Sequence, residues 1–250
     1  MNHEQPHLYT DLADWYPLLT APAEYAEEAA FFLLHCRDAC GTPPATLLEL
    51  GSGGGNMASH YKRHVQATLT DLSPQMLALS QRLNPDLEHV QGDMRTLRLD
   101  RVFDAVLVHD AVCYLTTEDD LRQAMETAYL HCWPGGVAVF APDHVRENFA
   151  QSSEVDGHDA PGRRLRYLMW TWDPDPSDGT YVVDFSYLLH EEGQPMRNIY
   201  ERHVHGLFSR ATWLRLFGEV GFQQTVVVPL DHPDVEPGTV DVFVTSRPAG

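Results

Sequence analysis

The residues best suited to chemistry lie in one stretch, residues 47–55, which reads Leu-Leu-Glu-Leu-Gly-Ser-Gly-Gly-Gly. A short apolar run there ends in the acid Glu49 and then breaks into glycines. Gly51, Gly53 and Gly55 have no Cβ atom, so the segment can take positive φ angles and a ligand can lie against its bare peptide groups. The pattern predicts a buried strand that opens onto a loop for binding a cofactor.

The spacing of the glycines discriminates between cofactor classes. A dinucleotide fingerprint that starts at Gly51 needs glycine at position 56, where this chain has Asn56, and the phosphate loop of nucleotide hydrolases ends in Gly-Lys-Ser/Thr. Neither pattern is present. The pattern E-x-G-x-G-x-G from Glu49 to Gly55 therefore indicates a different ligand.

Further features follow downstream and support an adenosine-bearing ligand. Residues 67–71 are predicted to form a second strand that ends in Asp71, an acid placed to accept both hydroxyls of a ribose. An apolar run such as 103–108 is typical of a parallel strand covered on both faces. The series is completed by Gly-Asp-Met at 92–94, by His109 and Asp110 after the apolar run, and by Trp-Pro-Gly-Gly-Val-Ala-Val-Phe at 133–140.

In their order and spacing these features resemble the class I S-adenosylmethionine-dependent methyltransferases. The resemblance implies that Glu49 and the glycine loop hold the amino-acid end of S-adenosylmethionine, and that Asp71 holds its ribose. It further implies that Asp93 and Met94 hold the adenine, that Tyr16 closes over the methionine carboxylate, and that the product is S-adenosylhomocysteine. The implied donor-site residues are Tyr16, Glu49, Gly51, Ser52, Gly53, Gly55, Asp71, Leu72, Met76, Asp93, Met94 and His109.

The elements that position these residues alternate between strand and helix patterns, which is typical of a doubly wound α/β fold with a parallel sheet. Ser73 and Pro74 supply an N-cap with proline at the first helical position. The resembled family ends in an antiparallel hairpin, so we expect a seven-stranded, mostly parallel, Rossmann-like sheet. The expected strands are 46–50, 67–71, 87–91, 103–108, 136–141, 223–228 and 239–246, and the expected helices are 23–40, 56–63, 73–83, 117–131 and 209–220.

The pattern changes after Pro142, where three β-rich runs at 164–172, 181–190 and 197–207 are joined by turn-rich connections. We expect an antiparallel insertion after the fifth strand, above the carboxyl edge of the sheet, where open α/β sheets bind their ligands. Such a cover suits a small acceptor. The chain, 1–250, is then a single methyltransferase domain with an N-terminal lid and helix (1–43), a donor-binding core (44–143 and 208–250) and a substrate cap (144–207).

The N-terminal pattern of Tyr9, Ala13 and Tyr16, together with the insertion, is similar to the small-molecule branch of the family. Glycine-type and amino-sugar N-methyltransferases are the relatives it suggests. The resemblance implies in-line transfer of a methyl group to nitrogen or oxygen, with catalysis mainly by positioning. Acceptor contacts are expected from Tyr9, Tyr114, Trp170 and His203. Trp170 shares a strand face with Trp172, and surface packing explains that pair equally well.

His109 is the candidate for a general base, because it follows the fourth strand at the carboxyl edge of the sheet. The alternative is that it only lines the donor pocket. Asp110 is expected to cap a helix rather than to act in catalysis. Asp143, His144, His203 and His205 are the further candidates. His203 and His205 share one strand face, but nothing fixes a third ligand beside them and His109, so we expect no metal.

Composition and charge limit the partners. The 250 residues include 17 Lys and Arg against 36 Asp and Glu, a formal net charge of −19. Nucleic-acid binding draws most of its affinity from basic side chains, so we expect no nucleic-acid partner. There is no apolar run of about 18 residues and no basic-then-apolar amino terminus, so we expect no membrane association and a cytoplasmic protein. Its four cysteines are expected to be reduced thiols.

Two other functions stay open at the level of sequence. One is a non-catalytic module that binds S-adenosylmethionine, and the other is a dinucleotide-dependent oxidoreductase, which Asn56 and Gly-Asp-Met disfavour. The sequence does not name the methyl acceptor, choose nitrogen over oxygen, or say whether a general base is needed. It also leaves the oligomeric state open, with a homodimer among the alternatives.

Overall fold

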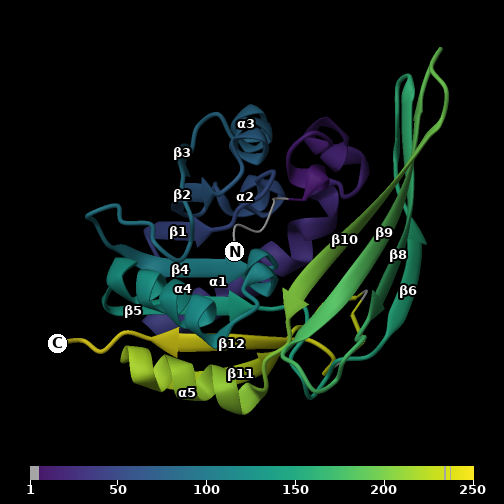
Figure 1. The fold of residues 1–250 in the computed structure, drawn as a ribbon. Coiled ribbons are helices and arrows are strands. Elements are labelled where there is room, and N and C mark those ends of the chain that lie inside the picture. The colour runs from purple at the N-terminus through teal and green to yellow at the C-terminus, as the bar shows by residue number, and fades with distance from the viewer. Residues whose placement is uncertain (1–5, 234, 237) are drawn as a thin grey trace.

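The computed structural model describes residues 6–233, 235–236 and 238–250. A seven-stranded sheet forms its centre: β1 (Thr46–Leu50), β2 (Gln66–Asp71), β3 (Glu88–Gln91), β4 (Phe103–His109), β5 (Cys132–Ala141), β11 (Gln223–Pro229) and β12 (Asp241–Ser246). The spatial order is β11-β12-β5-β4-β1-β2-β3 (Figure 1). β1 to β5 pair in parallel, whereas β12 is antiparallel to both β5 and β11. The predicted doubly wound, mostly parallel sheet is confirmed.

Helices cover both faces of this sheet, because alternate residues of a strand point to opposite faces. Leu48 and Val106 belong to the core cluster on the side of α4 (Glu118–His131) and α5 (Arg210–Val220). Leu47 and Leu107, one residue away on the same strands, belong to the cluster on the side of α1 (Ala26–Cys40) and α2 (Asn56–Tyr61). α3 (Pro74–Leu83) packs beside β2 and β3.

Local capping explains where several helices begin and end. The side chains of Ser73 and Ser209 accept hydrogen bonds of 3.1 Å from the backbone N–H groups of Met76 and Thr212, as expected for N-caps. Gly221 ends α5 with a φ of 110°. The first helix begins at Ala26 rather than near residue 23, because Pro22–Tyr25 forms a separate 3-10 helix, η3.

The cap forms a second, antiparallel sheet that stands beside the core (Figure 1). Its strands are β6 (Ser152–Asp156), β7 (Asp159–Ala160), β8 (Arg163–Trp172), β9 (Thr180–Glu191) and β10 (Arg197–Gly206). The order is β10-β9-β8-β6, and β7 pairs with β8. β8, β9 and β10 are the three expected strands. β6 and β7 correct that expectation: all their residues are exposed, so no alternation of buried and exposed residues marked them in the sequence.

The N-terminal lid lies between the core and the cap and contains two further 3-10 helices, η1 (His7–Tyr9) and η2 (Ala13–Leu18) (Figure 1, purple). Leu8 and Trp15 are buried in one cluster with Leu165 and Tyr187 of the cap. The guanidinium of Arg163 lies over the Trp15 ring, 3.9 Å from its centroid. The lid therefore packs on the inner face of the cap sheet.

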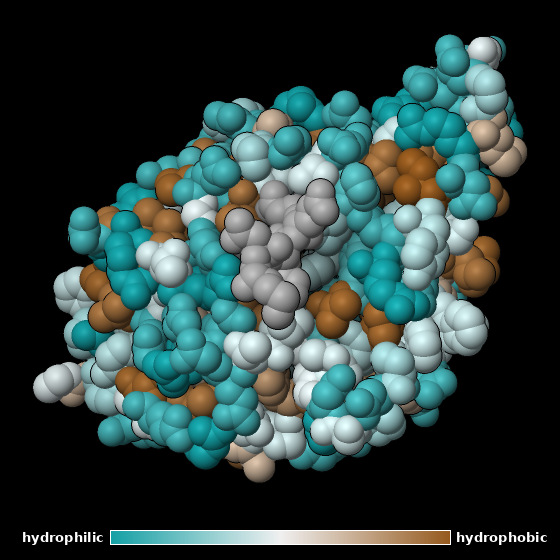
Figure 2. All heavy atoms as spheres, in the orientation of Figure 1, coloured by the Kyte–Doolittle hydropathy of each residue, from teal (hydrophilic) through white to brown (hydrophobic). Residues whose placement is uncertain are grey.

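Figure 2 shows a molecular face that is mostly hydrophilic, which agrees with the net charge of −19. Hydrophobic groups reach this face in small clusters, including some on the side of the cap. Across the described ranges, no helix is both long enough and apolar enough to span a lipid bilayer.

Candidate active site

The glycine loop begins where β1 ends and takes the backbone shape that the sequence predicts. Gly51, Gly53 and Gly55 have φ angles of 81°, 52° and 76°. A Cβ atom on Gly51 would lie 2.3 Å from the Cβ of Ala111, which follows β4. Only glycine therefore fits position 51, and the loop exposes peptide groups at the carboxyl edge of the sheet.

Asp71 lies at the end of β2 and faces this loop. One carboxylate oxygen accepts a hydrogen bond of 2.8 Å from Gly53 N–H, and the other accepts one of 2.8 Å from Ser73 N–H. Burial raises the pKa of Asp71, and the amides of Ser73 and Gly53 oppose that rise. Each oxygen keeps a second lone pair, so the carboxylate can still accept ribose hydroxyls.

Glu49 lies beneath the loop and is buried. Burial raises its pKa to about 7, although the hydrogen bond that the Tyr61 hydroxyl donates to it acts in the opposite direction. A carboxylate in this position suits a cationic ligand group, because a positive charge would compensate its lost hydration. Glu49 therefore fits the ammonium group at the amino-acid end of S-adenosylmethionine.

Two further features of the loop fit the same ligand end. The hydroxyl of Ser52 is buried and has no hydrogen-bond partner among the described residues, which is uncommon for a buried polar atom. The Tyr16 ring lies against the loop, since a Cβ on Gly54 would be 3.0 Å from it. Met76 and Met94 also reach the loop: their methyl carbons lie 3.8 Å from a Cβ on Gly53 and 3.0 Å from one on Gly51.

The carboxylate that was predicted to hold the adenine, Asp93, is already paired with an arginine. Arg95 holds the Asp93 carboxylate at 2.6 Å and reaches Asp120 at 2.7 Å. Burial would raise the pKa of Asp93, but the bonds from Arg95 lower it, so Asp93 is ionised. Leu72, also expected at the donor, is 47% exposed at the rim. The adenine assignment stays a prediction.

His109 is buried at the end of β4, beside two carboxylates. Its Nε2 atom lies 3.0 Å from Oε1 of Glu28 and 2.9 Å from Oδ1 of Asp110. Burial alone would lower the pKa of His109, but Asp110 and Glu28 raise it well above the usual value. An imidazole that already carries a proton cannot accept another, so this geometry disfavours His109 as the general base.

Asp110 occupies the N-cap position of the 3-10 helix that follows it, η4 (Ala111–Tyr114), but its side chain makes no capping hydrogen bond there, so the expectation that its carboxylate caps a helix is wrong. The backbone of Asp110 has a φ of 48°, a strained value for a residue other than glycine, and its side chain pairs with His109 instead. Asp143, two residues after the end of β5, is half-buried beside Asp110. Its low exposure and the Asp110 charge raise the pKa of Asp143 well above the usual value, which favours the protonated form.

Three of the predicted acceptor residues come together beneath the cap. The hydroxyls of Tyr9 and Tyr114 are 2.9 Å apart, and the Tyr114 hydroxyl lies 2.7 Å from Nδ1 of His203. Trp170 does not join them: it is 55% exposed and lies beside Trp172, on the opposite face of the sheet. The sequence showed that β8 has two faces but not which one the lid covers, and surface packing is the correct reading of this pair.

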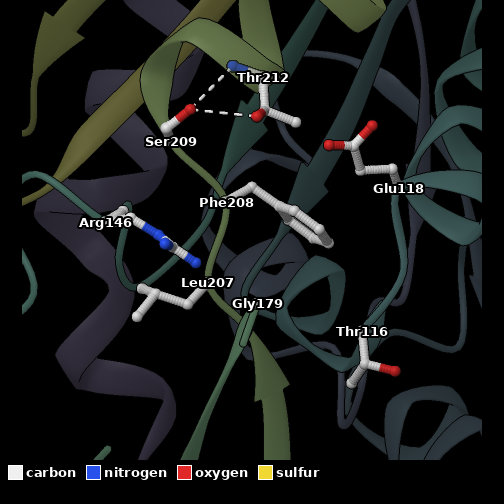
Figure 3. A pocket seen from close by; sticks show the side chains of 8 residues that line it. All are labelled: Thr116, Glu118, Arg146, Gly179, Leu207, Phe208, Ser209 and Thr212. Carbon is white, nitrogen blue, oxygen red and sulfur yellow. Dashed lines mark hydrogen bonds between the residues drawn. The ribbon is translucent and has the colours of Figure 1, made fainter. Parts of the chain in front are cut away.

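A cavity of about 440 Å³ lies where the cap joins the core (Figure 3). Arg146 reaches toward it from one side and Glu118 lies on the other, while Ser209 caps α5 above (Figure 3). Thr116 and Leu207, which line it, are two residues from Tyr114 and His205 in the chain. The lining residues are Thr116, Glu118, Arg146, Gly179, Leu207, Phe208, Ser209 and Thr212.

Sequence reasoning missed three charged or polar partners of the predicted residues: Glu28, Tyr61 and Glu201. Tyr61 carries a usable signal, because it lies on the helix that follows the glycine loop and contacts Glu49 only 12 residues earlier. Glu28 is 81 residues from His109, and Glu201 contacts Leu8 across 193 residues, so no local pattern marks them. In the described part of the chain, no three His, Cys, Asp or Glu side chains are grouped to hold a metal ion.

The chain is similar in sequence and in fold to known proteins. A family model described as a methyltransferase domain matches residues 47–136. A Streptomyces venezuelae protein, dTDP-3-amino-3,4,6-trideoxy-alpha-D-glucopyranose N,N-dimethyltransferase, is 30% identical over 222 residues, which cover 85% of this chain and 90% of that protein. The crystal structure of Streptomyces venezuelae DesVI matches with a TM-score of 0.81 at 26% identity, over 96% of this chain and 99% of that one.

A third relative is similar in fold alone. It is CalS10 from Micromonospora echinaspora, an amino pentose methyltransferase solved with S-adenosylmethionine bound, with a TM-score of 0.76 at 23% identity over 98% of this chain and 100% of that one. The family match includes the glycine loop, and the structural matches extend over the cap.

Proposed function

The chain belongs to the class I S-adenosylmethionine-dependent methyltransferases of the amino-sugar type, and we propose that it methylates the amino group of a nucleotide-linked amino sugar. Its methyl donor is S-adenosylmethionine and its acceptor is a small molecule. The observation that carries the proposal is the 30% identity to an enzyme named for a dTDP-linked amino sugar, over 85% of this chain. A match of that extent reaches well beyond residues 47–136, which the family model covers.

At the donor site, we propose that three polar residues at or beside the loop each hold one group of S-adenosylmethionine. Glu49 would hold the ammonium and Ser52 the carboxylate of the methionine end. Asp71 would hold the ribose hydroxyls. The buried, unpaired hydroxyl of Ser52 and the free lone pairs of Asp71 support these assignments. S-adenosylmethionine, when bound, supplies a methyl group that is already activated for transfer.

The acceptor half rests on the cap and on the cavity where it joins the core. We propose that the amino sugar lies against Tyr9 and Tyr114, and that its nucleotide end extends toward the cavity beside Arg146. A volume of about 440 Å³ is within the range of small-molecule sites. The residues there need only hold the amine in line with the methyl group, which by itself supplies much of the rate enhancement.

The two alternative functions gain no support from the site. An oxidoreductase would need the dinucleotide spacing that Asn56 breaks. A non-catalytic donor-binding module would not explain why three hydrogen-bonding side chains, Tyr9, Tyr114 and His203, meet beneath the cap next to the loop. N-methylation of a small amine accounts for both halves of the site.

We further propose that the chain forms a homodimer through the outer face of the cap sheet. This face carries neighbouring apolar residues that are each at least 42% exposed: Val155, Leu168, Trp170, Leu188, Tyr200 and Val204. Val155 pairs with Leu168 across β6 and β8, so the patch is continuous there. The net charge of −19 supports the absence of a nucleic-acid partner, and a cytoplasmic location stays a prediction from the composition.

A direct assay tests the proposed function. The purified chain is incubated with S-adenosylmethionine and a thymidine-diphosphate-linked 3-amino sugar, and the products are weighed by mass spectrometry. We expect the acceptor to gain one and then two methyl groups, while the same nucleotide sugar with a hydroxyl in place of the amine gains none. Binding of S-adenosylhomocysteine without transfer to any amine would favour the non-catalytic alternative.

A further inference from the structure

A buried line of three polar side chains runs away from the predicted acceptor position. The Tyr114 hydroxyl lies within hydrogen-bond distance of Nδ1 of His203, at 2.7 Å. Nε2 of His203 lies 3.3 Å from Oε2 of Glu201, which is an ion-pair distance without hydrogen-bond geometry. His203 and Glu201 are only 2% and 7% exposed. A glutamate is almost never this buried unless it is paired, so we ask what the buried contact between Glu201 and His203 does.

Glu201 is held as an anion. Its carboxylate accepts hydrogen bonds from the backbone N–H groups of His7 and Leu8 at the start of the lid. Burial by itself would raise the pKa of Glu201, but His203 and the two backbone amides lower it. An anion beside Nε2 favours the His203 tautomer with hydrogen on that atom, which leaves Nδ1 free to accept the Tyr114 proton.

The line also leads back to the donor loop. The Tyr9 hydroxyl is 2.9 Å from that of Tyr114, and the Tyr9 ring lies 6.3 Å from the ring of Tyr16. The Tyr16 hydroxyl in turn lies 3.6 Å from where a Cβ on Gly53 would be. An amine placed to meet the methyl group at the loop would therefore lie beside the Tyr9 and Tyr114 hydroxyls.

The reaction needs a proton acceptor at this position. An amino sugar is largely an ammonium ion at neutral pH, and its nitrogen has no lone pair to attack the methyl group until a proton leaves. His109 lies between Glu28 and Asp110, whose charges raise its pKa well above the usual value and so favour its protonated form. His205 is neutral, but burial and the nearby His203 and His144 lower its pKa to about 3, so it accepts a proton poorly.

We propose that His203 is the proton acceptor for the amine, reached through the Tyr114 hydroxyl, and that Glu201 is the positioning residue that keeps His203 ready to accept. This inference rests on the proposed function. An N–H bond of the ammonium breaks and its proton joins the Tyr114 oxygen, while the Tyr114 proton moves to Nδ1 of His203. The freed lone pair forms the new N–C bond, and the electron pair of the broken C–S bond stays on sulfur.

The titratable groups that contact His203 come from three elements. They are Tyr9 from η1, Tyr114 from η4, and Glu201 and His205 from β10. The two tyrosines are neutral in the working range because burial raises the pKa of each. His205 is neutral as well, because burial lowers its pKa, so Glu201 is the anion among these groups.

The proposal is tested by the pH dependence of kcat/KM for methylation of the nucleotide amino sugar. The wild-type enzyme should be active at neutral pH, where the amine is largely an ammonium ion and needs a proton acceptor. His203→Gln should lose about 100-fold at neutral pH and recover at high pH, where the amine loses its proton to water. Glu201→Gln should also lower kcat/KM at neutral pH, but less than His203→Gln does, since it removes the anion that orients the His203 ring and keeps the ring itself.

Further variants and a binding measurement distinguish loss of the proton path from a folding defect. Tyr114→Phe keeps the ring but removes the linking hydroxyl, and it should reproduce the His203→Gln profile. His190→Gln, on the same sheet but outside this line, should leave the profile unchanged. Calorimetry with S-adenosylhomocysteine checks that each variant still binds the donor product. A wild-type profile in both Tyr114→Phe and His203→Gln would overturn the proposal, whereas a wild-type enzyme with no transfer at all would overturn the proposed function instead.

Discussion

Gly53 donates its backbone N–H to the carboxylate of Asp71 at 2.8 Å, so the end of β2 is joined directly to the glycine loop that follows β1. The parallel pairing of β1 with β2 makes this contact, because Leu50 and Thr70 are partners in the register and both strands end at the same edge. One carboxylate therefore shapes the loop and also faces the predicted ribose position.

The first prediction follows from that double role. Asp71→Ala removes both the loop contact and the ribose acceptor, and it should weaken binding of S-adenosylhomocysteine roughly tenfold or more, the equivalent of about 1.4 kcal/mol. Asp71→Asn keeps the size and one acceptor oxygen and should lose less. Isothermal calorimetry measures both, and unchanged affinity in Asp71→Ala would remove the ribose assignment.

Gly51→Ala tests the shape of the loop. The added Cβ would lie 2.3 Å from that of Ala111, at a φ of 81°, so the loop must shift and donor binding should be lost. Gly218→Ala is a matched control in α5, because a Cβ there meets nothing within 4 Å. That control should bind normally and gain about 0.5 to 1 kcal/mol in unfolding free energy. Tight binding by Gly51→Ala would contradict the proposed approach of a ligand to this backbone.

Because the pKa of Glu49 is raised, we expect donor binding to depend on pH. Its pKa in the folded chain is about 7, raised by burial from the usual value, so the free protein must lose a proton before Glu49 can pair with an ammonium. Affinity for S-adenosylhomocysteine should therefore rise by roughly tenfold between about pH 5.5 and 7.5. Glu49→Gln should bind weakly with little pH dependence. A flat profile in the wild type would show that Glu49 does not receive the ammonium.

Because the pKa of His109 is raised in the folded state, we expect the free energy of unfolding to depend on pH. Its pKa is raised in the folded state by Asp110 and Glu28, so the ion pair contributes fully below the unfolded pKa of about 6.5 and is lost as pH rises through the higher folded value. Glu28→Gln should be less stable than wild type by about 1 to 3 kcal/mol near pH 6, and the difference should shrink at alkaline pH. Urea unfolding at several pH values measures it. A deficit that does not change with pH would contradict a charged His109.

Trp170→Asp tests the proposed homodimer. A charge in the apolar outer face of the cap should convert a dimer to a monomer, since buried unpaired charges are strongly unfavourable. Leu214→Asp, at another exposed apolar position, is the control and should leave the assembly intact. Sedimentation analysis gives the oligomeric state. A wild-type monomer, or a dimer that survives Trp170→Asp, would exclude this interface.

Much of the core could be predicted because its signals are local. The glycine loop, Asp71 at the next strand end and the N-caps Ser73 and Ser209 each depend on a few neighbouring residues. β6 escaped prediction because all five of its residues are exposed and give no periodic burial. Asp110 was misassigned because its strained backbone turns the carboxylate to His109 rather than to the helix.

The sequence by itself determined the family resemblance, the doubly wound sheet and the donor loop, since these follow from residue types at short, regular spacings. Only the tertiary structure decided which partners those residues meet. Glu28 reaches His109 across 81 residues, and Glu201 reaches Leu8 across 193, and no spacing along the chain encodes such contacts. The same holds for Trp170: alternation gives a strand two faces, but the packing of the lid decides which one is inside.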